Sequence, residues 1–137
     1  MIPIAIVAPF LTAYLTFVGL VLGSFINLVA DRLPRGESIV RPRSHCVACD
    51  RELNAIDLLP VLGYWLRRGR CATCGCRIGV SAPLVEAVAG ALMVAPIISF
   101  GLWPGAAAGL CLVAGWGLAV TSLAAHRYAA SARARAR

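Results

Sequence analysis

Cys46-Val-Ala-Cys49 and Cys71-Ala-Thr-Cys74 are two copies of one Cys-x-x-Cys motif, with twenty-one residues between them. Four thiolates at this spacing can close a tetrahedral site, and zinc is its usual occupant. An apolar residue follows each motif after four positions, Leu53 in the first copy and Ile78 in the second. The sequence therefore predicts a repeat of two metal-binding turns, each with an apolar residue packed beneath it. Two disulfides, or thiols without a ligand, are the alternatives.

The composition is that of a membrane protein. Of the 137 residues, 60% are hydrophobic and 14% are charged, and the apolar residues come in long blocks. The length leaves room for one small unit. The net charge of +7 is carried by arginine, since the sequence has no lysine, and the arginines lie only in one loop and in the C-terminal tail. This distribution favours topology control and attraction to anionic lipid over nucleic-acid binding. We expect membrane lipid as a partner and no nucleic acid.

Three apolar segments are long enough to cross a bilayer, which needs about 20 helical residues. We predict the first transmembrane helix in residues 1–30, the second over 83–100, and the third, with a basic tail, over 101–137. A signal peptide is the alternative for the first segment, but it lacks a basic start and a convincing cleavage site. The cysteines lie in the connecting loop, residues 31–82. The predicted fold is an all-α polytopic membrane protein with three transmembrane helices and a cytoplasmic four-cysteine zinc-binding loop between the first and second.

Two stretches predict where the helices touch. Gly19-x-x-x-Gly23 in the first span and Gly105-Ala-Ala-Ala-Gly109 in the third each put small residues on one helix face. Such faces let two helix backbones approach closely in a membrane.

The arginines also predict the orientation. The loop and the tail hold every arginine, whereas the N-terminus and the turn near Gly101 hold none. An odd number of spans puts loop and tail on one side, and the positive-inside rule makes that side the cytoplasm. We therefore expect an inner-membrane protein with its N-terminus outside and its loop and C-terminus in the cytoplasm. Because the cytoplasm is reducing, this orientation favours a metal site over disulfides.

A small polar cluster is expected at the inner ends of the first two spans. Asn27 and Arg32 end the first span, and Glu86 lies near the start of the second. Since an unpaired carboxylate at membrane depth is costly, we predict that Glu86 pairs with Arg32 or is hydrogen-bonded to Asn27. A contact that locks the two helices and a functional acid are both consistent with this cluster.

Short motifs follow one another in an order typical of a known family: Gly23-Ser-Phe-Ile-Asn27, Arg32-Leu-Pro34, the two cysteine pairs, Gly69-Arg-Cys71 and Pro83-Leu-Val-Glu86. Over roughly residues 19–95 the chain resembles the N-terminal domain of the bacterial type IV prepilin leader peptidase/N-methyltransferase family. These inner-membrane enzymes of type IV pilus and type II secretion biogenesis cleave prepilins and pseudopilins, then methylate the new N-terminus from S-adenosylmethionine. The resemblance implies that Cys46, Cys49, Cys71 and Cys74 bind zinc.

The chain departs from this family in the residues of proteolysis. The family uses two membrane-boundary aspartates beyond this domain, one of them in a Gly-x-Gly-Asp motif, and aspartic proteolysis needs such a carboxylate pair. This sequence has no aspartate after Asp57, and Leu118 follows its Gly115-Trp-Gly117. Ser81-Ala82 replaces the family's Arg-Tyr. We therefore predict no catalytic residue in this chain. Cys76 is additional to the four family cysteines. It could compete as a ligand, but we expect it to be a neighbour of the metal that does not bind it.

Three functions follow as hypotheses. The first is a non-proteolytic subunit, or a docking module, for prepilin or pseudopilin or for a separate catalytic subunit. The second is the N-methyltransferase half of a split enzyme, with S-adenosylmethionine as cofactor. It rests on the resemblance alone, because no Gly-rich nucleotide loop is present. The third, a membrane-tethered zinc ribbon on nucleic acid, has only the charge in its favour. A truncated peptidase is a further alternative.

Overall fold

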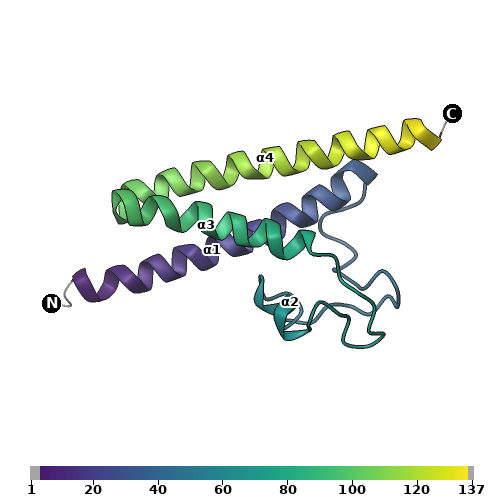
Figure 1. Cartoon of the computed structure of the whole chain (residues 1–137), viewed down its shortest axis with the longest axis horizontal. Coiled ribbons are helices and arrows are strands. Elements are labelled where there is room, and N and C mark those ends of the chain that lie inside the picture. The colour runs from purple at the N-terminus through teal and green to yellow at the C-terminus, as the bar shows by residue number, and fades with distance from the viewer. Residues whose placement is uncertain (1–3, 136–137) are drawn as a thin grey trace.

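The computed structural model describes residues 4–135. Three long helices dominate it: α1 (Ile4–Arg32), α3 (Ser81–Phe100) and α4 (Leu102–Arg135). Two short helices, η1 (Leu33–Arg35) and α2 (Leu62–Leu66), lie in the connection between α1 and α3 (Figure 1). All three long helices are long and apolar enough to cross a membrane. The predicted all-α fold, with three spans and a cysteine-bearing loop between the first two, is confirmed.

α1 and α3 each extend two residues beyond the predicted spans, and α4 lies within the predicted range of the third span and tail. α1 includes Pro9 near its start, and α3 begins at Ser81, so that Pro83 falls in its first turn, where no backbone donor is needed. α4 has 34 residues and, at about 1.5 Å each, is about 51 Å long. That length exceeds the ~30 Å of a hydrocarbon core. The last turns of α4, which carry Arg133 and Arg135, therefore extend beyond the apolar layer.

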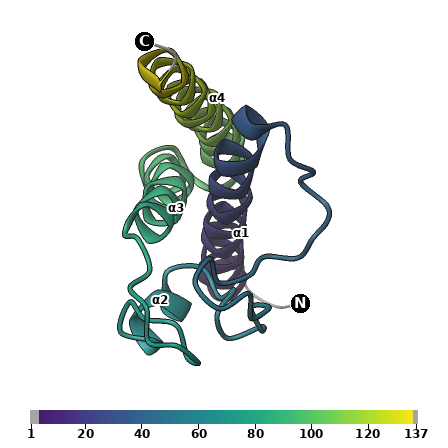
Figure 2. The same cartoon turned by 90° about the vertical axis from the view of Figure 1, so that its right-hand side faces the viewer.

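Each long helix contacts the other two, as the two views of Figures 1 and 2 show. The buried core is built on α3, where Ala89, Met93 and Ile97 recur every four residues and so share one face. Val113 of α4 completes this core. Ala89 and Met93 are fully buried, which makes α3 the central helix of the bundle.

Both predicted small-residue faces pack against α3. A Cβ atom at Gly23 would lie 2.7 Å from the Cα of Glu86, and one at Gly19 would lie 2.7 Å from the Cβ of Met93. A Cβ at Gly109 of α4 would lie 2.9 Å from the carbonyl oxygen of Met93. These distances leave no room for a side chain, so the backbones are in close contact. The predicted packing at both faces is confirmed.

The three long helices alternate in direction. The connection from α1 to α3 and the C-terminal end of α4 lie toward one end of the bundle, on the right in Figure 1. The start of α1 and the tight turn at Gly101 between α3 and α4 lie at the other end. The fold therefore places the cysteine-bearing loop and the arginine-bearing end of α4 on the same side of the bundle.

Candidate metal centre

The two Cys-x-x-Cys motifs form the same hydrogen-bonded turn, which we call the first knuckle (residues 46–51) and the second knuckle (residues 71–76). In each, the amide of the first residue donates to the carbonyl of the sixth at 2.9 Å. The amide of the fifth residue donates back to the carbonyl of the first, at 2.9 Å in the first knuckle and 3.1 Å in the second. The fifth residue has a left-handed backbone in both, with φ 54° at Asp50 and φ 70° at Gly75. The predicted repeat is confirmed at the level of the backbone.

The apolar residues after the knuckles also occupy equivalent places. The amide of Leu53 donates to the carbonyl of Ser44 at 2.9 Å, and the amide of Ile78 donates to that of Gly69 at 2.8 Å. Leu53 is half-buried, whereas Ile78 is 38% exposed. Both side chains are partly exposed, so neither is fully buried beneath its turn.

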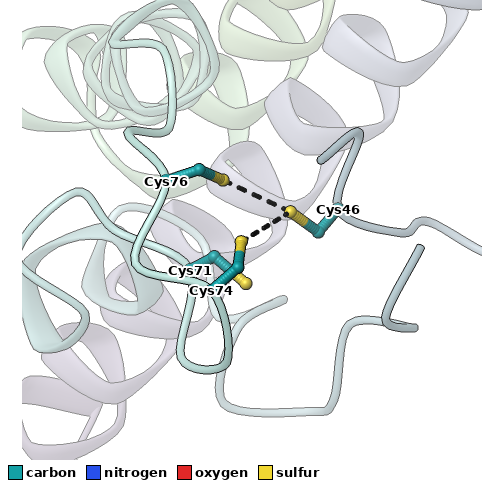
Figure 3. A group of neighbouring side chains, drawn as sticks. All are labelled: Cys46, Cys71, Cys74 and Cys76. Atoms are coloured by element: carbon teal, nitrogen blue, oxygen red, sulfur yellow. Dashed lines mark hydrogen bonds between the residues drawn. The ribbon is translucent and has the colours of Figure 1, made fainter. Parts of the chain in front are cut away.

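Four thiols come together between the knuckles, and Figure 3 shows those of Cys46, Cys74 and Cys76 facing one another with Cys71 beside them. The sulfur atoms of this cysteine cluster all lie within 4.8 Å of one another: Cys46, Cys71, Cys74 and Cys76. The Sγ of Cys46 lies 3.3 Å from that of Cys76 and 3.8 Å from that of Cys74. Cys49 lies beside the cluster, with its Sγ 3.9 Å from that of Cys71. Three of the four predicted ligands thus belong to the close group, and the fifth thiol, Cys76, joins them.

The thiols fit a metal ion that prefers sulfur. All six cysteines are free in the structure, so it does not show the alternative with two disulfides. Sulfurs held about 2.3 Å from a tetrahedral zinc ion are about 3.8 Å apart. The Cys46–Cys74 and Cys49–Cys71 separations of 3.8 and 3.9 Å match this spacing, whereas the Cys46–Cys76 separation of 3.3 Å is shorter. The cluster can therefore hold a metal ion of this kind.

The first cysteine of each knuckle is prepared to bind metal as a thiolate, the form that coordinates. The backbone amides of Cys74 and Thr73 lower the pKa of Cys71 to about 6 against the effect of burial, and the guanidinium of Arg51 contributes in the same direction. In the first knuckle, the pKa of the leading cysteine is also lowered, chiefly by the amide of Ala48. These two cysteines are buried as well, at 8% exposure for the first and 6% for the second.

Asp57 fastens the first knuckle to the rest of the loop, in an arrangement that we call the Asp57 clamp. Its side chain is 6% exposed and accepts from Arg51 and from Arg67, each at 2.7 Å. The amide of Asn54 donates to the same carboxylate at 3.1 Å. Burial raises the pKa of Asp57, but the amide of Asn54 and the two guanidinium groups outweigh it and hold the pKa below its ordinary value. Arg51 also lowers the pKa of Cys71, so the clamp acts electrostatically on the metal centre.

The predicted polar cluster has different partners in the structure. Glu86 is 8% exposed, and its Oε2 accepts from the backbone amide of Val61, just before α2, at 2.7 Å. Arg32 is 7% exposed and donates to the carbonyl of Ser38 at 2.7 Å. Among the hydrogen bonds and ion pairs of residues 4–135, Glu86 is joined to neither Arg32 nor Asn27. Both buried charges are used to fasten the loop to the helix bundle.

Sequence reasoning missed the Asp57 clamp and the role of Val61. Asp57 is separated from its partners by six and ten residues, which follows no helix or strand period, and Val61 takes part only through its backbone. No signal in the sequence identifies either. The place of Cys76 in the cysteine cluster did have a signal in the sequence. The spacing Cys74-Gly-Cys76 puts a further thiol two residues from a predicted ligand.

Comparisons with known proteins identify the family of this chain. Residues 17–100 match the family described as Bacterial Peptidase A24 N-terminal domain. No solved structure matches the chain significantly.

Curated relatives are named as prepilin-processing enzymes. A prepilin leader peptidase/N-methyltransferase of Myxococcus xanthus (strain DK1622) is 42% identical over 93 residues, covering 68% of this chain and 28% of that protein. One of Bacillus subtilis (strain 168) is 40% identical over 84 residues, covering 61% and 34%. The type 4 prepilin-like proteins leader peptide-processing enzyme of Escherichia coli O78:H11 is 33% identical over 132 residues, covering 82% and 45%. This chain spans less than half the length of each of these relatives.

Proposed function

Because the chain belongs to the bacterial peptidase A24 N-terminal domain family, we propose that it is an inner-membrane docking module of type IV pilus or type II secretion biogenesis. It binds a prepilin or pseudopilin, or a separate catalytic subunit, without hydrolysing a peptide itself. The observation that carries this proposal is a loop folded around thiols and fastened to a membrane helix through Glu86 and Val61. Asp57, the last aspartate of the sequence, is held by two arginines and is not free to act as an acid.

Zinc is the ion that we propose for the metal centre, with Cys46, Cys49, Cys71 and Cys74 as its ligands. The free thiols and their 3.8 and 3.9 Å separations support this assignment. When bound, the ion supplies folding energy to the loop, as structural zinc does in small domains. The chain's own part is to present the two buried leading cysteines as thiolates and to hold both knuckles in one backbone conformation.

The loop and the C-terminal end of α4 face the cytoplasm in this proposal, and the N-terminus lies outside. The arginine distribution supports that orientation. Two variants test it: Val47→Cys in the loop, where Val47 is 95% exposed, and Phe100→Cys beside the α3–α4 turn, where Phe100 is 69% exposed. A membrane-impermeant maleimide applied to intact spheroplasts should label only the second above the wild-type background. Labelling of the first variant alone would show the opposite orientation and contradict this proposal.

The surface of α2 is the docking surface that we propose. Its three large apolar side chains are exposed: Leu62 at 59%, Trp65 at 70% and Leu66 at 65%. Exposed apolar groups of this size mark a contact with lipid or with a partner. The Val61–Glu86 hydrogen bond sits directly before α2, so this surface has a fixed position relative to α3.

Binding of a prepilin tests the docking function. The full chain in lipid nanodiscs should bind a fluorescent prepilin peptide that contains the leader, measured by anisotropy. Trp65→Ala should weaken binding by about tenfold or more, as expected for an aromatic side chain that becomes buried when the peptide binds. Trp103→Ala is the matched control, because Trp103 is 78% exposed but lies at the start of α4, at the opposite end of the bundle. Absence of peptide binding, together with no co-purifying membrane subunit, would contradict the proposal.

Methyl transfer is the second candidate, because the printed names of the relatives include N-methyltransferase. The purified chain is incubated with labelled S-adenosylmethionine and a processed pilin peptide. The docking proposal predicts no transfer of label by this chain alone. Stoichiometric transfer to the peptide N-terminus would favour the methyltransferase hypothesis.

A further inference from the structure

The metal centre contains one thiol more than a tetrahedral ion needs, and we propose that Cys76 can replace Cys49 as the fourth ligand. The ion is then held by Cys46, Cys71 and Cys74 together with either of the two. This inference rests on the proposed metal function and concerns which thiols share the site.

Cys76 owes its place to the repeat. It is the sixth residue of the second knuckle, where Arg51 stands in the first. The Sγ of Cys76 lies 3.3 Å from that of Cys46, the leading cysteine of the other knuckle. The carbonyl of Cys76 is held by the amide of Cys71 at 2.9 Å, so the backbone keeps this thiol at the centre.

Cys76 belongs to the close group of thiols, whereas Cys49 lies beside it. The sulfur of Cys76 lies within 4.8 Å of those of Cys46, Cys71 and Cys74. The sulfur of Cys49 lies 3.9 Å from that of Cys71 and outside the mutually close group. Because tetrahedral zinc takes four ligands, one of the five thiols must be left out. The geometry gives Cys76 at least as good a position as Cys49.

The two exchangeable thiols differ in exposure. Cys49 is exposed, whereas Cys76 is half-buried. If an electrophile alkylates Cys49, the sulfur gains a carbon bond, the leaving group departs and that ligand is lost. Cys76, whose sulfur already lies within 4.8 Å of the other three, then completes a set of four thiolates. The fifth thiol therefore makes the site tolerant of damage at Cys49, although Cys74 is an exposed ligand too.

Cobalt(II) tests this inference, because its absorption reports how many thiolates surround it. The full-length protein in detergent is stripped of metal and titrated with cobalt(II) as wild type, Cys49→Ser, Cys76→Ser and the double variant. Both single variants should keep the charge-transfer intensity and the visible bands of a four-thiolate site. The double variant should show weaker, blue-shifted bands and lose more than about 100-fold in affinity, beyond the 10–100-fold typical of losing a supporting contact.

Two control variants separate this inference from the proposed metal function. Cys46→Ser removes a shared ligand and should abolish the four-thiolate spectrum, whereas Cys111→Ser in α4 should leave it unchanged. If Cys49→Ser behaves like Cys46→Ser while Cys76→Ser resembles wild type, Cys49 is an obligatory ligand and the inference is overturned. If wild type itself gives no thiolate spectrum, the metal function fails, and the inference fails with it.

Discussion

The first and second knuckles share one backbone and differ in what their sixth residue supplies. In the first knuckle this residue is Arg51, whose guanidinium is held by the buried carboxylate of Asp57. In the second it is Cys76, whose side chain meets only another thiol among the hydrogen bonds of the described residues. The comparison teaches that backbone hydrogen bonds define the repeat, whereas its side chains are free to diverge. We therefore expect the first knuckle to be supported mainly by the Asp57 clamp and the second to depend more on a bound metal.

Metal removal should produce the largest difference in amide exchange between the two knuckles. After chelation, or in Cys71→Ser, we expect the amides of the second knuckle to exchange with solvent rapidly. Those of the first knuckle should stay partly protected by the Asp57 clamp, and the three long helices should persist, since their core is separate. Hydrogen exchange with mass spectrometry, alongside zinc analysis, measures this. The Cys111→Ser variant serves as the control. Equal protection of both knuckles without metal would show that the clamp supports nothing.

Removal of the clamp should erase the remaining difference. Asp57→Asn keeps the shape of the side chain but loses the charge that holds Arg51 and Arg67, a loss of about 2 kcal/mol for charge-assisted hydrogen bonds. In the metal-free protein, the first knuckle should then exchange as fast as the second. Asp31→Asn is the matched control, because Asp31 pairs with Arg35 at 64% exposure and such surface pairs contribute about 1 kcal/mol or less. A first knuckle that remains protected in Asp57→Asn would contradict this assignment.

Acid should act on the same clamp. The pKa of Asp57 is held below its ordinary value of 3.8 in the folded loop. A lowered folded-state pKa gives a stabilisation that is complete above the ordinary value and is lost as the pH falls through the folded-state value. The difference in protection between wild type and Asp57→Asn should therefore be constant above about pH 5 and shrink below pH 3.8. Metal-free protein is used, so that protonation of thiolate ligands does not contribute.

The fifth positions of the knuckles allow the finest comparison. Gly75→Ala places a side chain on a backbone with φ 70° and should destabilise the second knuckle by about 1 kcal/mol. A Cβ there meets nothing within 4 Å, so the cost is conformational alone. Asp50→Gly relieves the same strain in the first knuckle and should be neutral or slightly stabilising. Thermal unfolding of the loop, followed by metal release, measures both. A larger effect of Asp50→Gly than of Gly75→Ala would contradict the equivalence of the two turns.

The features that could be predicted from the sequence are those with a regular spacing. The spans follow from uninterrupted apolar segments, the glycine faces from a four-residue period, and the knuckles from two identical motifs. These signals are local, because each depends on residues only a few positions apart. Leu53 and Ile78 are an example. They follow their motifs at the same offset, and their backbone amides make equivalent hydrogen bonds in the structure.

The features that could not be predicted depend on the path of an irregular loop. Glu86 was expected to meet a charged or amide side chain on α1, but the loop folds back and offers it a backbone donor at Val61 instead. Arg32, the expected partner, instead donates to the carbonyl of Ser38, six residues further on. A backbone donor has no side-chain signature, so neither composition nor periodicity could identify this partner.

The Glu86–Val61 hydrogen bond has a consequence for how the protein responds to its bilayer. Glu86 lies on α3 at the point where Gly23 of α1 makes its closest approach, so its position follows the tilt of these two helices. Transmembrane helices tilt to match the thickness of the surrounding lipid. A change of membrane thickness would therefore move the carboxylate and draw α2 with it. Through this hydrogen bond, the position of α2 is coupled to the packing of α1 against α3.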